Sequence, residues 1–478
     1  MINFIKNLIF ILNIRIKIII FYNLYIIFFM DENYKISKYE NKIKNTNDND
    51  KIRKYKNKIL KYKMNGGNKN FADTGGLSGI KTIIKDTSLI ENGPHRDILR
   101  KPFPIKPDDY QVNLDMNNPI PVFAYGAINN KSKLLPVEFD RRAPRDDDVV
   151  FKILFCGVCH SDWHVIMDEW KNTKYPIVTG HEMTGIVIGL GKKVSNFNIG
   201  DKVALSPLYN SCGICDNCKN SHEQYCENDA TETYNMPDRG PGDIKPVGPI
   251  TQGGYSNIMV VNEKFLFKFP DNLPMDSGAP LLCAGITVYN AVKTLGIQPG
   301  QVLGVAGIGG LGSTLLKLCR ILDIKTIALT TTEWKLKDSL RLGAQKAVLM
   351  KDRETLEKME GTLDFIIDTI PFAHEIDDYL KLLKLFGTHC VVGAFFSQNV
   401  DFNTVIRKGK IIRASNIGSI RETTDFLNFC SRNNFYPEIE LIQFDKLNET
   451  RDNLLKSKAK YRYVIDIENS MSRQNRIR

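Results

Sequence analysis

The stretch that decides the fold is VLGVAGIGGLGS, residues 302–313. Its first five residues predict a buried strand, and a glycine-rich turn then leads into a helix that we expect over residues 313–322. The glycines follow the pattern G-x-G-x-x-G, and amides at the start of such a helix can hold a pyrophosphate, so the stretch predicts a dinucleotide site. The expected contacts in this turn are Gly307, Gly309, Gly310, Leu311 and Gly312.

A second predicted strand, residues 325–329, ends in a run of threonines. An NAD-preferring site normally ends this strand with Asp or Glu, whose carboxylate binds the ribose 2′-hydroxyl and repels a 2′-phosphate. The hydroxyls of Thr331 and Thr332, together with the ammonium of Lys335, suit a phosphate instead, so the sequence favours NADP. Glu333 is an acidic residue close to this position and so argues against NADP. We expect it instead to begin the next helix, near the positive end of that helix.

Between Pro119 and Gly285 the chain has short Val- and Ile-rich runs separated by Gly and Pro turns, which predict a β-rich domain. The predicted strands lie in IPVFAYGAI, VVFKILFCGV, EMTGIVIGLG, DKVALSP and GGYSNIMVV. From Gly285 onward, strand, turn and helix alternate, as is typical of a parallel sheet covered by helices. The composition, 42% hydrophobic and 25% charged, excludes collagen and coiled coils and matches an ordinary globular protein, and the alternating elements predict the α/β class.

Four cysteines lie within fifteen residues in the spacing C-x2-C-x2-C-x7-C, which favours a metal over a disulfide framework. Four thiolates fill the tetrahedral shell of zinc and leave no open position, so we expect a structural zinc. The expected ligands are Cys212, Cys215, Cys218 and Cys226. A zinc ribbon that binds nucleic acid is the competing interpretation, although Lys219 is one of few basic residues in this lobe.

A catalytic zinc needs three protein ligands and an open position, and its ligands usually come from distant parts of the chain. The candidates are Cys159 in CGVCHSD, His181 in GHE and Cys283 in PLLCAGIT. Each of the three is weak evidence alone, because a lone Cys in an apolar run is usually core and a lone His is usually structural. Their combination has to be recognised through the surrounding motifs.

Five motifs follow one another along the chain: CGVCHSD (156–162), GHE (180–182), the four-cysteine lobe, LLCAGIT (281–287) and GIGGLGS (307–313). In this order they resemble the zinc-dependent medium-chain alcohol dehydrogenases, and most closely the cinnamyl alcohol dehydrogenase group of NADP-dependent aldehyde reductases. The resemblance runs from about Ile120 to Ile467. It implies a GroES-like β-rich catalytic domain, residues 119–283 and 416–468, with an inserted Rossmann domain, a doubly wound parallel sheet, at 284–415.

The resemblance also implies roles for single residues. Cys159, His181 and Cys283 would bind the catalytic zinc, with Glu182 able to approach the metal. Asp162 would orient a ligand from behind, Ser161 and His164 would relay the proton, and Cys156 would be structural. Two zinc ions per chain, NADP and a homodimer are therefore expected. An alcohol would be bound at zinc and lose hydride to the nicotinamide, and an aldehyde would be reduced in the opposite direction.

One departure from the resemblance concerns the substrate. Members that act in lignin synthesis carry Trp just before a TYN-like stretch, whereas this chain has Glu232 before Thr233-Tyr234-Asn235, with a one-residue insertion. We therefore expect a broad range of small alcohols and aldehydes, aromatic and aliphatic, rather than a dedicated phenylpropanoid site.

The formal net charge of +11 is concentrated in the first 118 residues, which hold 21 Lys and Arg against 12 Asp and Glu. The rest of the chain is almost balanced at +2. We interpret residues 1–118 as a low-complexity basic extension, with disorder expected over the Lys- and Asn-rich residues 31–70, and residues 469–478 as a tail.

Residues 1–30 do not have the pattern of a membrane span. The clean apolar run, residues 18–30, is thirteen residues long, whereas a span needs about 20. The segment resembles a signal peptide but lacks a small-residue cleavage site. Because clustered thiolates persist best in a reducing compartment, we expect a cytoplasmic protein, with targeting or membrane tethering through residues 1–30 as the alternative.

The sequence leaves two other functions to be weighed. A zinc-ribbon protein could bind nucleic acid or a membrane surface through the basic extension. We expect no nucleic-acid partner, and membrane contact only if the N-terminal segment is retained. A zinc-free quinone reductase shares the fold but should lack the set Cys159, His181 and Cys283, which is complete here.

Overall fold

The computed structural model describes residues 80–82, 114–395, 400–456 and 458–470, all within one unit of the chain, residues 76–478. The disorder expected over residues 31–70 and the targeting expected of residues 1–30 lie outside the described residues. Within the described part, no helix combines the length and the apolar character needed to cross a membrane.

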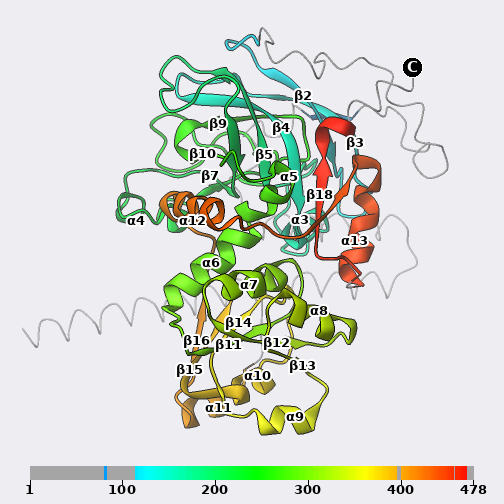
Figure 1. Cartoon of the computed structure of the whole chain (residues 1–478). Helices are drawn as coiled ribbons and strands as arrows, with labels where there is room; N and C mark the ends of the chain where they lie inside the picture. The colour runs from blue at the N-terminus through cyan, green and yellow to red at the C-terminus, as the bar shows by residue number, and fades with distance from the viewer. Residues whose placement is uncertain (1–79, 83–113, 396–399, 457, 471–478) are drawn as a thin grey trace, which may run out of the picture. The chain divides into compact units, whose positions relative to one another are not determined.

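The β-rich domain is built on a seven-stranded sheet in the order β10-β6-β5-β4-β18-β17, with β9 also paired to β4 (Figure 1). The central strand β4 is buried along almost its whole length, because β5, β9 and β18 all pair with it. The strands of this sheet are β4 (Asp148–Val158), β5 (Met183–Leu190), β6 (Lys202–Leu205), β9 (Ile258–Asn262), β10 (Leu266–Lys268), β17 (Ile439–Ile442) and β18 (Arg462–Asp466).

Two small sheets complete this domain. The strands β1 (Ile80–Thr82), β3 (Leu135–Arg141) and β2 (Ile120–Gly126) form one of them, and β7 (Leu208–Asn210) pairs with β8 (Thr231–Glu232) in the other. Leu114 and Met116, which the sequence analysis placed in the extension, pack against the core of the β-rich domain.

The predicted strand in GGYSNIMVV begins only at Ile258 in the structure. The residues before it hydrogen-bond elsewhere: the Gly253 amide donates to the carbonyl of Val178 and the Tyr255 amide to that of Thr179. The segment 253–257 is therefore laid against the residues that precede His181, which matters for the site described below.

The second domain is a six-stranded parallel sheet in the order β13-β12-β11-β14-β15-β16. Its strands are β11 (Val302–Ala306), β12 (Lys325–Thr330), β13 (Lys346–Leu349), β14 (Leu363–Asp368), β15 (Leu383–Val391) and β16 (Ile411–Ala414). Its helices are α7 (Gly310–Ile321), α8 (Trp334–Leu342), α9 (Arg353–Lys358), α10 (Asp377–Leu382) and α11 (Phe402–Arg407). The predicted α/β architecture is confirmed.

The helix after the glycine turn begins three residues earlier than the sequence analysis expected, at Gly310 rather than at residue 313. The Ser313 amide already donates to the carbonyl of Gly309, so the last glycines belong to the first helical turn. Strand β11 has the predicted bounds, and β12 is one residue longer than predicted.

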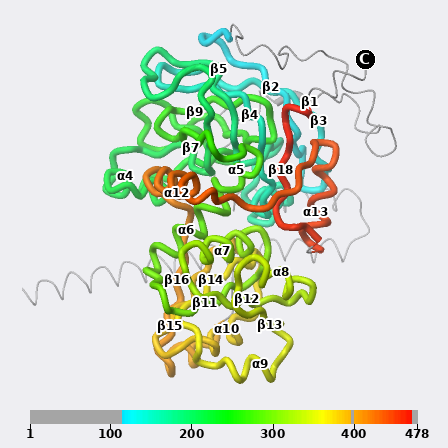
Figure 2. Tube along the Cα trace, in the orientation of Figure 1, coloured from blue at the N-terminus to red at the C-terminus, as the bar shows by residue number. Residues whose placement is uncertain are grey.

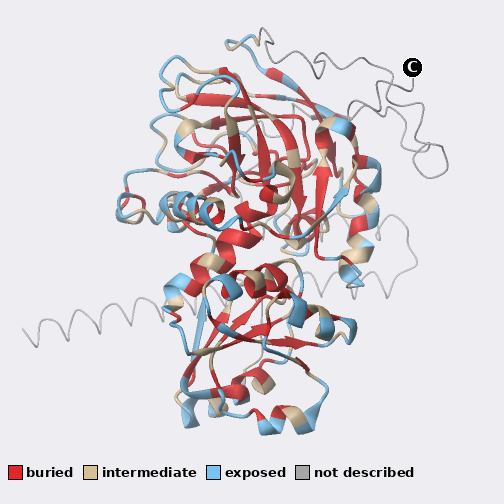
Figure 3. Cartoon of the chain, viewed as in Figure 1, coloured by how far each residue is buried: buried red, intermediate tan, exposed pale blue. Residues whose placement is uncertain are grey.

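Helix α6 (Ala284–Leu295) connects the two domains, and α12 (Ile420–Asn433) packs beside it as the chain returns (Figure 2). A Cβ on Gly285 would lie 2.7 Å from the ring of Phe426, so the two helices approach closely at a glycine. Most strands of both sheets are buried, whereas β16 is exposed along its length (Figure 3). Further helices of the described residues include α3 (His160–Ile166), α4 (Asp216–Lys219), α5 (Met275–Gly278), α13 (Leu447–Leu455), and the 3-10 turns Glu223–Tyr225, Glu263–Phe265, Ala279–Leu282 and Phe444–Lys446.

Candidate active site and metal centres

The first candidate ligand lies where the central strand of the β-rich domain ends. Strand β4 stops at Val158, and Cys159 caps the N-terminus of α3. The third residue of that helix, Asp162, accepts a hydrogen bond from the Cys159 amide at 2.9 Å. Cap and helix therefore fix the backbone of Cys159, which lines the pocket, and its Sγ lies 3.8 Å from Ser161 Oγ.

The structure brings the four predicted residues of the catalytic metal site together. One donor atom from each of Cys159, His181, Glu182 and Cys283 lies within 4.8 Å of the others, and all four residues are buried. His181 Nε2 is 3.2 Å from Cys283 Sγ. Two thiols, an imidazole and a carboxylate that converge in this way suit zinc, which binds sulfur and nitrogen donors in tetrahedral sites.

The carboxylate of Asp162 contacts two of these ligands from behind the site. Its Oδ2 accepts from the Cys159 amide and, at 2.8 Å, from the Tyr255 hydroxyl. Its Oδ1 accepts from the Gly180 amide at 2.9 Å and lies 3.0 Å from His181 Nδ1. A carboxylate at Nδ1 favours the tautomer with the proton on that nitrogen, which would leave Nε2 to bind a metal. Although burial lowers the pKa of His181, Asp162 raises it well above its usual value.

Glu182 has a partner that the sequence analysis did not identify. Arg462, on β18, forms a buried ion pair with Glu182 Oε1. Burial raises the pKa of Glu182 to about 8, while Arg462 acts in the opposite direction. A Cβ on Gly310 would lie 2.3 Å from Cδ of Arg462, so the guanidinium also lies beside the glycine turn. The only sequence signal was the stretch YRYVID, which carried the resemblance but no role.

The four-cysteine lobe forms a second cluster. One sulfur from each of Cys212, Cys215, Cys218 and Cys226 lies within 4.8 Å of the others. The amides of Cys215 and Cys218 donate to the sulfurs of Cys212 and Cys215, each at 3.4 Å. Such N–H···S contacts stabilise thiolates, and four sulfurs fit the closed shell of a structural zinc.

The predicted cofactor residues line a pocket of about 680 Å³ between the two domains, a size typical of ligand sites. Gly307, Gly309, Gly310 and Leu311 are on its wall, and Thr331, Thr332 and Lys335 line it as well. Gly312 lies behind the wall, where a Cβ would come within 2.0 Å of the Gly307 carbonyl oxygen. Cys159 and Cys283 line the same pocket, so the candidate metal site adjoins the cofactor site.

Lys335 is 7% exposed, and burial lowers the pKa of its ammonium. Glu333 caps the N-terminus of α8, as expected, and its carboxylate pairs with Lys351 at 2.5 Å. The carboxylate that could have repelled a 2′-phosphate is thus paired with a cation, and Lys335 remains in the pocket wall.

The predicted relay residues face different spaces. Ser161 lines the large pocket, whereas His164 lines a small adjoining cavity of about 20 Å³. His164 Nδ1 pairs with the half-exposed carboxylate of Glu169, and its ring stacks on Trp170 with centroids 5.4 Å apart. Phe372 and His160 line both spaces. Glu169 is therefore a polar group that the sequence analysis missed, although it lies only five residues from His164.

The sequence analysis also missed a buried cluster under the cofactor pocket. Asp368, the last residue of β14, lies 3.0 Å from His374 Nε2 and 3.1 Å from His389 Nε2. His374 Nδ1 is 2.8 Å from the carbonyl oxygen of Phe372. Both neighbours of His374 are acceptors, so the protonated ring is favoured beside them. Although burial opposes it, Asp368 raises the pKa of His374.

The residues 231–235, singled out for the substrate, lie beside the metal site. The Tyr234 hydroxyl is 3.0 Å from His181 Nδ1, and Tyr234 is 5% exposed. Glu232, on β8, is exposed. The sequence analysis considered this stretch only for the substrate and did not foresee the contact with a metal ligand.

Comparison with known proteins covers both domains. Residues 145–271 match the alcohol dehydrogenase GroES-like domain, and residues 310–432 match the zinc-binding dehydrogenase domain. A probable zinc-type alcohol dehydrogenase-like protein of Acanthamoeba polyphaga mimivirus is 39% identical over 424 residues, 87% of this chain and 100% of that protein. That match is longer than the part of the chain after residue 118, so it runs into the N-terminal extension.

Two solved structures are similar to almost three quarters of the chain. A cinnamyl alcohol dehydrogenase of Sorghum bicolor is 36% identical with a TM-score of 0.70, covering 72% of this chain and 97% of that one. The CAD of Helicobacter pylori, complexed with NADP(H), is 36% identical with a TM-score of 0.69, covering 74% and 99%. The four-cysteine lobe lies inside the matched GroES-like domain, which does not favour an independent zinc ribbon.

Proposed function

Because the chain belongs to the zinc-dependent medium-chain alcohol dehydrogenases, in the cinnamyl alcohol dehydrogenase group, we propose that it interconverts primary alcohols and aldehydes with NADP(H) and works mainly as an aldehyde reductase. The observation that carries the proposal is the buried set Cys159, His181, Glu182 and Cys283 beside the cofactor pocket. We propose a second zinc in the four-cysteine lobe, and hence two zinc ions per chain.

Zinc held by Cys159, His181 and Cys283 would polarise the substrate oxygen, and NADP(H) would deliver or accept the hydride. Asp162 keeps His181 in the tautomer that leaves Nε2 unprotonated. Glu182, held by Arg462, supplies a carboxylate next to the same donors.

We propose that Ser161 and His164 stand at the two ends of the path by which the proton leaves the site. Ser161 offers a hydroxyl at the pocket wall, one turn of α3 before His164. His164 Nδ1 contacts the carboxylate of Glu169, whose side chain is 50% exposed. A proton leaving the substrate alcohol would therefore be exchanged with water through this edge of the domain.

The preference for NADP rests on Thr331, Thr332 and Lys335. All three line the pocket after β12, where the sheet carries threonine instead of the acidic residue typical of NAD sites. Lys335 supplies the positive charge that a 2′-phosphate needs.

We propose a broad substrate range because the position of the lignin-type tryptophan is held by the exposed, acidic Glu232. A carboxylate offers no aromatic platform and favours polar or small substrates over phenylpropanoids.

We also propose a homodimer. Strand β16 is the last in its sheet, and it exposes Ile411 by 48% and Ile412 by 37%. A second copy could continue the sheet by pairing at this edge and would cover both side chains. Light scattering should give twice the chain mass, and Ile412→Lys should shift it toward the monomer.

The function is tested by following NADPH oxidation with benzaldehyde and cinnamaldehyde, with NADH side by side. Zinc-loaded enzyme should turn over aldehydes with NADPH, and Cys159→Ala should lose that activity. Activity that survives this substitution, or no turnover across the panel, would contradict the proposal. We place the enzyme in the cytoplasm, because its clustered thiols suit a reducing compartment.

A further inference from the structure

After the four-cysteine lobe, the chain forms a loop, residues 228–239, whose two ends lie together. One arginine, Arg239, bonds the two ends to each other. Arg239 is 3% exposed, and its Nη2 donates to the carbonyls of Asn228 at 2.8 Å and Asp229 at 2.6 Å. Its Nη1 donates to the carbonyls of Asp243, at 3.1 Å, and Ile244. One guanidinium thus closes the loop 228–239 and anchors it to the next turn of the chain.

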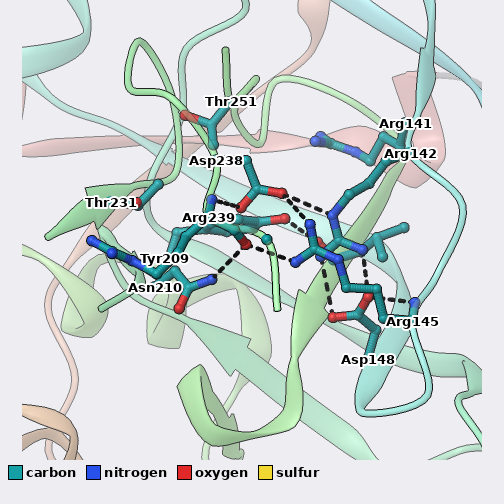
Figure 4. Close-up of polar contacts among 12 residues, drawn as sticks. Arg141, Arg142, Arg145, Asp148, Tyr209, Asn210, Thr231, Asp238, Arg239 and Thr251 are labelled. Atoms are coloured by element: carbon teal, nitrogen blue, oxygen red, sulfur yellow. Dashed lines mark hydrogen bonds and ion pairs between the residues drawn. The ribbon is translucent and has the colours of Figure 1, made fainter. Parts of the chain in front are cut away.

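The base of this loop is held from the rest of the domain as well (Figure 4). Asp238 accepts from Arg142 Nε at 2.9 Å and pairs with Arg145 Nη2 at 3.2 Å. Arg145 Nη1 donates to the carbonyl of Arg239 at 2.8 Å. Arg142 is paired in turn with the buried Asp148 at the start of β4. The base is therefore fixed to the central strand of the large sheet.

The middle of the same loop reaches the catalytic cluster. Strand β8 pairs with β7, and three residues after Thr231 the Tyr234 hydroxyl lies 3.0 Å from Nδ1 of His181. The two ring centroids are 5.7 Å apart. At the other end, the Asn228 side-chain amide donates to Cys212 Sγ at 3.4 Å. The loop thus contacts a ligand of each proposed zinc site.

We propose that Arg239 is a positioning residue for the catalytic centre: by closing the base of loop 228–239 it keeps the Tyr234 hydroxyl on Nδ1 of His181. The inference rests on the proposed function for the identity of the metal. It goes further in assigning control of His181 to a residue outside the pocket, and in coupling the two metal sites through one loop.

Arginine suits this position because its acceptors come in two pairs on opposite sides. The planar fork presents Nη1 to one pair of carbonyls and Nη2 to the other, which a single ammonium cannot reproduce. All four acceptors are main-chain carbonyls, so the contact fixes the path of the backbone rather than one side chain.

The test compares Arg239→Gln, Tyr234→Phe and the double variant in the full-length zinc-loaded enzyme. The measurement is the rate of zinc release to a coloured chelator, which needs no turnover. The kinetic phase of zinc release that is missing in Cys159→Ala is assigned to the catalytic zinc. Exposed Arg432→Gln is the matched control and should release zinc like the wild type.

Removing a group that orients a metal ligand costs about 10- to 100-fold in metal affinity or activity. We therefore expect both single variants to speed release of the catalytic zinc by about that factor. The double variant should be no faster than either single variant, because both changes break the same contact. The kcat for aldehyde reduction should fall in parallel if the proposed reaction is correct. An enzyme with no aldehyde reduction at all would refute the proposed reaction but not the role of Arg239.

Two outcomes would overturn the proposal. One is Arg239→Gln protein that melts at a lower temperature but releases the catalytic zinc at the wild-type rate, which is what a merely structural role predicts. The other is a double variant that releases the catalytic zinc faster than the wild type by the product of the two single-variant factors, because the two substitutions would then act independently. If Arg239→Gln does not fold, Arg239→Lys keeps the charge but loses the fork, and it is judged by the same two criteria.

Discussion

Replacing Asp162 with Asn tests the hydrogen bonds behind the metal ligands. Each carboxylate oxygen accepts from one main-chain amide and one side chain: Oδ2 from Cys159 and Tyr255, Oδ1 from Gly180 and His181. An asparagine side chain replaces one of these two oxygens with an NH2 group, which cannot accept a hydrogen bond. Whichever oxygen is replaced, the NH2 group then faces a main-chain N–H, that of Cys159 or that of Gly180. The Tyr255 hydroxyl can rotate to accept, so the less costly orientation leaves the Cys159 amide without an acceptor.

The magnitude follows from this geometry. A buried donor left unsatisfied costs about 1–3 kcal/mol, and replacing charged by neutral acceptors weakens the three other bonds by about 1–2 kcal/mol together. We expect the free energy of unfolding to fall by about 2–5 kcal/mol. Because the Cys159 backbone and the His181 ring both lose their support, affinity for the catalytic zinc should fall by about 10- to 100-fold.

Urea denaturation measures the first effect, and competition with a zinc chelator measures the second. Asp271→Asn is the matched control, because the side chain of Asp271 is 94% exposed. Zinc in the four-cysteine lobe should be unaffected. Catalytic zinc affinity within twofold of the wild type in Asp162→Asn would refute the reasoning, because the carboxylate would then contribute nothing to the orientation of His181.

Three further predictions concern the cofactor domain. Lys335→Ala should raise the KM for NADPH by about 10- to 100-fold, the worth of a charged hydrogen bond, and leave the KM for NADH nearly unchanged; equal losses in steady-state assays would count against the 2′-phosphate contact. Gly312→Ala should weaken NADPH binding in calorimetry by about tenfold or more, since its Cβ would lie 2.0 Å from the Gly307 carbonyl oxygen and force helix and turn apart. His374→Asn should lower the free energy of unfolding by about 1.5–3 kcal/mol near pH 6 and by less near pH 9. The pKa of His374 is raised in the folded protein, chiefly by Asp368 against the effect of burial, so its contribution is complete below the unfolded pKa and is lost as the pH rises through the folded one; a loss that does not change with pH would contradict this.

Features encoded by local pattern could be predicted from the sequence. The glycine turn, strand β11 and the four-cysteine set follow from residue type and spacing. The catalytic ligands are distant from one another, and only the resemblance to a known family joined them. Within the glycine turn, the predicted start of α7 was three residues late, because the glycines that make the turn also form the first helical turn.

Contacts between distant segments could not be predicted. Arg462 pairs with Glu182 across 280 positions, and Tyr255 reaches Asp162 across 93. Neither residue differs in its local sequence from an ordinary strand or loop residue. A charged or phenolic side chain becomes a positioning group only when burial forces it to find a partner.

The sequence by itself therefore predicted the four-cysteine lobe and the cofactor turn, because the chemistry of zinc and of a pyrophosphate restricts which residues can serve and at what spacing. Only the tertiary structure showed which further residues hold the candidate catalytic site: Tyr255 on Asp162, Arg462 on Glu182, and Arg239 closing the loop that carries Tyr234. The physical reason is that buried polar groups must satisfy one another, and their partners are set by where the folded chain brings its segments together.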